Sequence, residues 1–94
     1  VTGTVHNENA PAGRIAICSG GGGEEIYQMQ AKGYGTYLTG EENHWVSNAA
    51  ADMGINILFA GHYATETFGV KALGKLLQEK FGLPTVFIDN PTGM

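Results

Sequence analysis

The hydrophobic pattern of this chain alternates between short apolar runs and longer segments with helical spacing. The apolar runs predict strands at 14–18, 36–39, 55–60 and 85–89. The run INILFA at 55–60 is apolar at nearly every position, which is typical of a strand buried in a parallel sheet. The segments between the runs predict helices over 24–33, 40–54 and about 64–80, and Gly33 and Gly54 stand where the first two should end.

The third of these helices has the clearest periodicity. Val70, Leu73, Leu77 and Phe81 recur at helical spacing and predict an apolar face. The three lysines of this segment occupy other angles and are expected to face water. The resulting order, β-α-β-α-β-α-β, predicts an α/β fold with a mostly parallel sheet flanked by helices.

The length of 94 residues fits one domain. We expect residues 14–94 to form a single α/β domain and residues 1–13, which are polar and rich in Gly, Asn and Ala, to be a leading segment or linker with at most a short strand. Because the first residue is Val1, we expect the sequence to be a fragment or a processed product.

Composition narrows the classes of partner. The net charge is −4 and the five Lys and Arg residues do not cluster, which argues against nucleic-acid binding. No apolar run approaches the ~20 residues of a membrane span, and no signal-peptide pattern is present. The single cysteine, Cys18, rules out a disulfide within the chain and is compatible with a reducing cytosol. We therefore expect a cytoplasmic protein, with Cys18 a small buried residue at the end of its strand.

The stretch FAGHYATETFG at 59–69 holds the leading candidate site. His62 and Glu66 stand one helical turn apart at the start of the third helix, so both side chains share a face. Imidazole and carboxylate are common ligands of zinc, iron and manganese. The alternative is a surface histidine beside an acid that complements the helix dipole. Two ligands do not complete a metal site, and the possible additions, none with diagnostic spacing, are His6, Glu41, Glu42 and His44.

Two further loops follow predicted strands at the same edge of the sheet. The glycine run SGGGG at 19–23 matches neither common nucleotide-phosphate motif, and Glu24 and Glu25 stand where phosphate charge would lie. It is either a tight turn that needs positive φ or a place where a neighbouring group approaches the backbone. In TGEENHW at 39–45, the acids either cap a helix, or Glu41 and His44 line the cleft as catalytic proton carriers.

Four motifs together resemble a known family. RIAICSGGGG, YLTGEENH, NILFAGHYATETFGVKALGKLL and VFIDNPTG occur in this order, and they are similar to the carboxy-terminal half of the Nif-three-like dinuclear-metal proteins, whose bacterial members are often labelled GTP cyclohydrolase type-two homologues. The resemblance covers about Arg14 to Met94.

The resemblance implies a two-lobed α/β protein with two divalent metal ions in the cleft between its lobes, assembled as a homo-oligomer, typically a hexamer. It implies that His62 and Glu66 are metal ligands. In the family the other ligands, a histidine pair and an aspartate, belong to an amino-terminal half that these residues do not include. The function implied is metal-dependent hydrolysis of a small molecule such as GTP or a related heterocycle. The alternative is a non-catalytic module for ring assembly or metal binding, while a nucleotide-phosphate module would rest on SGGGG alone.

Overall fold

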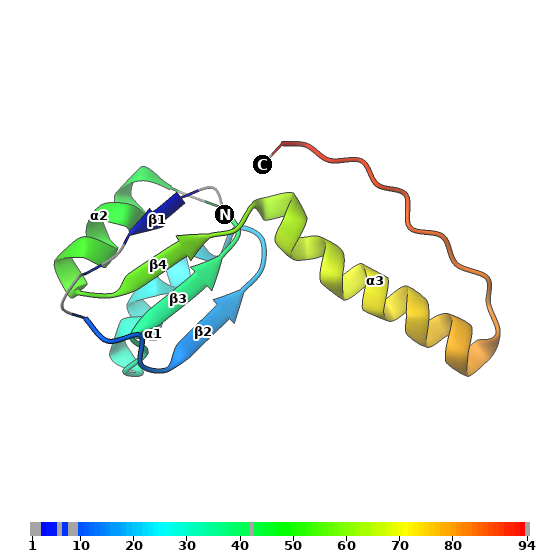
Figure 1. The fold of residues 1–94 in the computed structure, drawn as a ribbon, viewed down its shortest axis with the longest axis horizontal. Helices are drawn as coiled ribbons and strands as arrows, with labels where there is room; N and C mark the ends of the chain where they lie inside the picture. Colours follow the sequence, from blue (N-terminus) through cyan, green and yellow to red (C-terminus); the bar gives the residue numbers. More distant parts are fainter. Residues whose placement is uncertain (1–2, 6, 8–9, 42, 94) are drawn as a thin grey trace.

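A computed structural model describes residues 3–5, 7, 10–41 and 43–93 of the chain. It shows an α/β fold with one four-stranded sheet, and this is the fold class that the sequence predicts (Figure 1). The candidate residues His6 and Glu42 lie outside the described residues.

The sheet is mostly parallel, in agreement with the sequence pattern. Its strands are β1 (Gly3–Val5), β2 (Ile15–Cys18), β3 (Thr36–Thr39) and β4 (Asn56–Phe59). They lie in the order β1-β4-β3-β2, with β2, β3 and β4 parallel and β1 antiparallel to β4. In this register Tyr37 lies opposite Ala16 on one side and Ile57 on the other.

The helices follow the predicted segments with shifted starts. A short 3₁₀ turn, η1 (Gly22–Glu25), leads into α1 (Ile26–Ala31), and the later helices are α2 (His44–Met53) and α3 (His62–Phe81). Helix α3 begins at His62 rather than near Ala64. Gly54 ends α2 in the left-handed region, with φ of 71°, as the sequence predicts.

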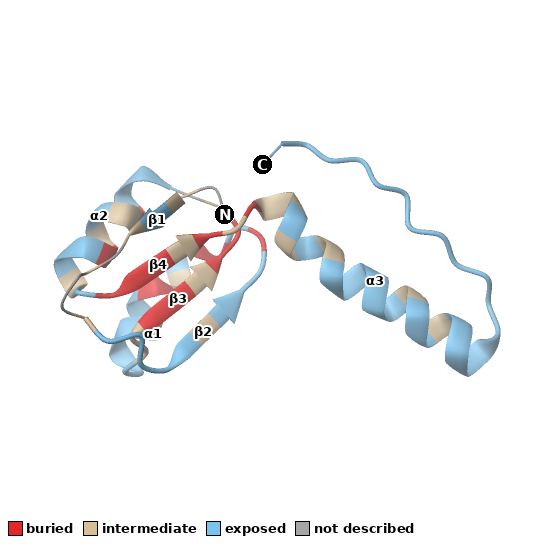
Figure 2. Ribbon diagram, viewed as in Figure 1, coloured by how far each residue is buried: buried red, intermediate tan, exposed pale blue. Residues whose placement is uncertain are grey.

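The hydrophobic core lies between one face of the sheet and helices α1 and α2. Tyr37, Ile57 and Phe59 point from the central strands toward Ile26 of α1 and Val46 of α2, and all five are fully buried. Figure 2 shows that buried residues concentrate in β3, β4 and the elements beside them. The opposite face is less covered, since Ile15 and Ile17 of the edge strand β2 are 57% and 74% exposed.

Helix α3 does not pack on the sheet. It projects away from it together with residues 82–93, and we call α3 with residues 82–93 the arm (Figure 1). None of the residues of α3 is buried, and Val70, Leu73 and Phe81 are 58%, 55% and 66% exposed. The apolar stripe is present as predicted, but no described residue covers it enough to bury any of its members.

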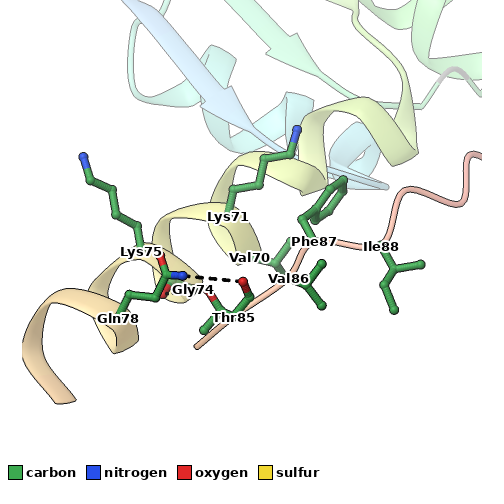
Figure 3. Close-up of a pocket in the computed structure, with 9 residues that line it drawn as sticks. All are labelled: Val70, Lys71, Gly74, Lys75, Gln78, Thr85, Val86, Phe87 and Ile88. Atoms are coloured by element: carbon green, nitrogen blue, oxygen red, sulfur yellow. Dashed lines mark hydrogen bonds between the residues drawn. The ribbon is translucent and has the colours of Figure 1, made fainter. Parts of the chain in front are cut away.

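The prediction of a fourth strand at 85–89 is wrong for this structure. The segment runs back along α3 without joining the sheet, and its first contacts are with the helix: the Thr85 hydroxyl donates to the Gly74 carbonyl oxygen and the Gln78 amide donates to the Thr85 carbonyl oxygen (Figure 3). Phe87 lies under the Lys71 ammonium, 4.5 Å from the ring centroid. The physical reason is that the arm carries the segment away from both sheet edges, so no strand lies beside it to pair with. The strand that completes the four-stranded sheet is instead β1, near the beginning of the chain, which pairs with β4.

Cys18 is exposed rather than buried. Strand β2 is an edge strand, so only β3 flanks it, and the cover on its outer side is incomplete. Within the described part of the chain, no helix has the length and hydropathy that crossing a membrane requires.

Candidate functional site at the carboxyl edge of the sheet

The loops that follow β2, β3 and β4 meet at the carboxyl edge of the parallel strands, as the strand order predicts. The Gly40 and Glu41 amides both donate to the Gly20 carbonyl oxygen, at 3.1 and 3.0 Å. The Gly61 amide donates to the Gly40 carbonyl oxygen at 2.8 Å. These bonds join three segments far apart in sequence into one backbone platform, which is where ligands of open α/β sheets bind.

Thr65 fastens the glycine loop to the start of α3. Its hydroxyl accepts the Gly20 amide at 2.9 Å and donates to the Gly61 carbonyl oxygen at 2.8 Å. Thr65 is not among the residues that the sequence pattern singles out. The available signal was a threonine one turn after Gly61, since Thr side chains in a first helical turn commonly bond to the backbone carbonyl one turn earlier.

The glycine loop forms a tight turn and also lets neighbouring side chains approach its backbone, so both alternatives from the sequence apply. Gly20 has φ of +69°, which favours glycine, and a Cβ there would lie 2.3 Å from Glu66 Oε1 and 3.3 Å from His62 Nε2. A Cβ on Gly40 would lie 2.6 Å from the Gly20 carbonyl oxygen. The backbone of residue 20 therefore turns tightly and also touches the candidate ligands.

His62 is held between two carboxylates. Its Nδ1 lies 2.9 Å from Oε2 of Glu41, and its Nε2 lies 3.3 Å from Oε1 of Glu66. The three side chains are 35%, 38% and 56% exposed, in the order His62, Glu41, Glu66, so the cluster opens to solvent mainly on the Glu66 side.

The carboxylates change the titration of the histidine. The hydrogen bond with Glu41 raises the pKa of His62, partial desolvation opposes this, and the negative charge of Glu66 adds to the increase. The reason is that a carboxylate favours the charged imidazolium over the neutral ring.

The donor atoms of His62 and Glu66 are of types that bind divalent metal ions. A neutral His62 that donates through Nδ1 presents the lone pair of Nε2 to the Glu66 carboxylate, and two lone-pair donors facing each other are an attractive location for a cation. Among the residues that the structure describes, no three His, Cys, Asp or Glu side chains form a group suited to a metal ion. The described residues therefore offer two facing donors here, fewer than a complete site requires.

The two predicted proton carriers lie in different surroundings. Glu41 is engaged with His62, as described above. His44 is the exposed first residue of α2, and no hydrogen bond or ion pair of the described residues joins its ring to Glu41, His62 or Glu66. The catalytic roles of Glu41 and His44 stay predictions.

The fold and the cluster define an α/β domain with a histidine and two carboxylates at the carboxyl edge of a parallel sheet. Comparison with known proteins places it further: the family model for Duf34/NIF3 (NGG1p interacting factor 3) matches residues 1–93. The chain belongs to this family.

Relatives of known sequence and structure agree with this assignment. The chain is 53% identical over 81 residues to the GTP cyclohydrolase 1 type 2 homolog of Pyrococcus horikoshii, covering 86% of this chain and 32% of that protein. It is 41% identical over 91 residues to the Deinococcus radiodurans protein with the same description, covering 96% of this chain and 35% of the relative. The chain thus spans about a third of the length of these curated relatives.

Solved structures show the same fold. TTHA1606 from Thermus thermophilus superposes with a TM-score of 0.76 at 44% identity, over 83% of this chain and 31% of that one. The protein ybgI, described as of unknown function, superposes with a TM-score of 0.81 at 27% identity, over 99% of this chain and 46% of that one. The second match includes nearly the whole chain, and with it the arm.

Proposed function

We propose that this chain contributes His62 and Glu66 to a dinuclear site for divalent metal ions, and that the complete protein is a metal-dependent hydrolase. The observation that carries the proposal is the approach of His62 Nε2 to Glu66 Oε1, 3.3 Å apart, with the Gly20 backbone against both. Zinc, iron and manganese are the candidate ions, because a mixed nitrogen and oxygen donor set suits each of them.

Divalent ions bound at such a site would act as Lewis acids and activate water. The residues of this chain would hold and orient them: His62 and Glu66 as ligands, and the glycine loop as a wall that leaves no room for a side chain. We propose His44 as a carrier of protons between the cleft and solvent, since it is exposed and stands at the loop after β3.

We propose a nucleotide or related heterocycle as the substrate, with GTP as the first compound to test. The support is the name of the relatives, which are called GTP cyclohydrolase 1 type 2 homologs. The open side of the cluster, next to Glu66, leaves access for a small molecule.

We propose that an amino-terminal half, supplied by the same chain or another, completes the ligand set. The matched relatives are about three times as long as the matched region, and two donors are too few for a metal site. We further propose a homo-oligomer, hexameric in the full-length form, located in the cytoplasm. The exposed stripe on α3 and the exposed Ile15 and Ile17 offer apolar surface for such contacts.

A second candidate is a non-catalytic module for ring assembly or structural metal binding. The arm favours it, because the helix turns beyond the cluster expose large apolar side chains such as Leu73 and Phe81. In this alternative, loss of the cluster would leave assembly intact and there would be no hydrolysis to lose.

The test is elemental analysis and native mass of the full-length protein, beside His62→Ala and Glu66→Ala. Glu24→Ala is the matched control, since Glu24 is an exposed acid of the glycine-loop region with no role in the cluster. We expect stoichiometric metal in the wild type and the control, and its loss in both cluster variants, together with loss of GTP hydrolysis.

Two results would redirect the proposal. A full-length protein that holds its metal in both cluster variants would place the metal elsewhere. A full-length protein that assembles, binds metal at the cluster and hydrolyses neither GTP nor related heterocycles would support the non-catalytic module.

A further inference from the structure

Glu41 contacts the His62 ring on the side away from Glu66. Its carboxylate meets Nδ1, whereas Glu66 meets Nε2, and the two nitrogens of an imidazole ring point in different directions. The described residues contain no three-ligand group, so Glu41 does not share a common centre with His62 Nε2 and Glu66.

The backbone that carries Glu41 is held in place from outside its own loop. The Glu41 amide donates to the Gly20 carbonyl oxygen at 3.0 Å, and the preceding Gly40 is bonded to both Gly20 and Gly61. Gly61 is itself the residue before His62. The donor ring and the carboxylate that meets it are therefore attached to the same hydrogen-bonded platform.

A carboxylate can only accept hydrogen bonds, so the 2.9 Å contact requires the proton on Nδ1. In the neutral ring this leaves the lone pair on Nε2, the nitrogen that faces Glu66. A histidine free in water has no such constraint. Carboxylates in this arrangement behind metal-binding histidines set ring orientation and raise ligand basicity.

We infer that Glu41 is a positioning residue, which fixes the tautomer and the orientation of His62 so that the Nε2 lone pair faces Glu66, where a metal ion would be held, and that it is neither a ligand nor a free proton carrier. This inference rests on the proposed metal-binding function. From the sequence alone, Glu41 is a candidate for proton transfer. Its engagement with Nδ1 replaces that role with one exerted through His62.

The test compares Glu41→Gln, Glu41→Ala and the Glu24→Ala control in the full-length protein. The glutamine oxygen can still accept the bond from Nδ1–H, whereas alanine cannot. The first readout is nitrogen NMR of the metal-free protein, at a pH where the His62 ring is neutral, because it reports which nitrogen carries the proton. The exposed His44 ring is the internal reference. The second readout is titration with Zn²⁺ alone, measured by calorimetry.

We expect His62 to carry its proton on Nδ1 in the wild type and in Glu41→Gln, and to shift toward the Nε2–H form in Glu41→Ala while His44 is unchanged. We expect Zn²⁺ affinity to fall by about 10–100-fold in Glu41→Ala, the range found when such supporting partners are removed, and by clearly less in Glu41→Gln. Glu24→Ala should match the wild type in both readouts.

Three results would overturn the inference, and each is distinct from failure of the proposed function. Equal losses of Zn²⁺ affinity in the glutamine and alanine variants, as large as that of Glu66→Ala, would make Glu41 a ligand. An unchanged tautomer in Glu41→Ala would remove the positioning role, as would unchanged affinity. If the wild-type protein binds no Zn²⁺, the proposed function fails first, and the positioning role for a metal ligand fails with it.

Discussion

The carboxyl edge of the sheet and the arm differ in how far their residues are packed within this chain. At the edge, Gly20, Gly40 and Gly61 connect three loops through backbone hydrogen bonds, and a side chain on Gly20 or Gly40 would collide with the neighbouring loop or the candidate ligands. In the arm, no residue of α3 is buried, and Leu73 and Val86 are 55% and 82% exposed. The loops of the sheet edge therefore find partners within this chain, whereas the apolar side chains of the arm are covered only in part by the described residues.

This difference identifies the arm as the surface of the chain that is most in need of a partner. An apolar helix face that stays largely exposed contributes little to stability by burial, since the hydrophobic contribution depends on the area removed from water. The relatives are about three times as long as the matched region, so they have additional chain that could cover such a face. The contrast between edge and arm leads to four predictions, in decreasing order of expected effect.

The largest expected difference in stability is between alanine substitutions at Ile57 in β4 and at Leu73 in α3. Ile57→Ala removes a fully buried side chain, and we expect a loss of about 2–5 kcal/mol in the free energy of unfolding of the 94-residue chain. Leu73→Ala changes an exposed position and should cost no more than about 0.5 kcal/mol. Urea unfolding measures both. A loss for Leu73→Ala as large as that for Ile57→Ala would mean that the arm is packed in solution.

The second contrast uses two glycines with similar backbone angles. Gly20 and Gly33 have φ of +69° and +78°, so alanine at either should cost about 1–2 kcal/mol of backbone strain. Only Gly20 lies against Glu66, whereas a Cβ on Gly33 meets nothing within 4 Å. We expect both variants to lose similar stability on denaturation, and only Gly20→Ala to lose Zn²⁺ affinity in the full-length protein. Equal affinities would show that the glycine loop does not shape the site.

The third prediction concerns pH and the core beneath the edge. Burial raises the pKa of Tyr37 from 10.0 to about 12, because the folded state disfavours the phenolate. Folding therefore favours the neutral phenol. The resulting contribution to the free energy of unfolding is fully present below pH 10.0 and is lost as the pH rises from 10.0 to about 12.

Chemical denaturation across this range should show a falling free energy of unfolding for the wild type. The fall should be smaller in Tyr37→Phe, which has no phenol at that position. Tyr27→Phe is the control, because Tyr27 is 56% exposed and the loss of its hydroxyl should leave the fall in place. Identical profiles for the wild type and Tyr37→Phe would contradict the assignment.

The smallest effect is expected within the arm. The Tyr63 hydroxyl donates to the Asp89 carboxylate and accepts the Asn90 amide, both at 2.8 Å, and so ties the end of the extended segment to the start of α3. Tyr63→Phe should speed hydrogen exchange of the Asn90 amide and leave the sheet amides unchanged. Asp89→Ala keeps the acceptor of the Asn90 amide and should change its exchange less. Equal exchange rates in all three proteins would show that this tie is absent in solution.

Much of the fold was predictable from local pattern. The runs at 14–18, 36–39 and 55–60 contain strands, and Gly54 ends a helix, because apolar content and glycine conformational freedom act over a few residues. The strand predicted at 85–89 was wrong because a strand needs a neighbour, and sequence alone does not supply one. The error at Cys18 has the same origin, since burial depends on whether a strand is central or at an edge.

The order of residues along the chain sets the α/β order of elements and puts a histidine and a glutamate one helical turn apart at the end of a strand. Which of these groups meet depends on the packing of the folded chain. Glu41 is 21 residues from His62, and Gly20 is 45 residues from Thr65, yet each pair is joined by a hydrogen bond. Parallel strands bring distant loops to one edge, and this pairing is a property of the sheet rather than of any local segment.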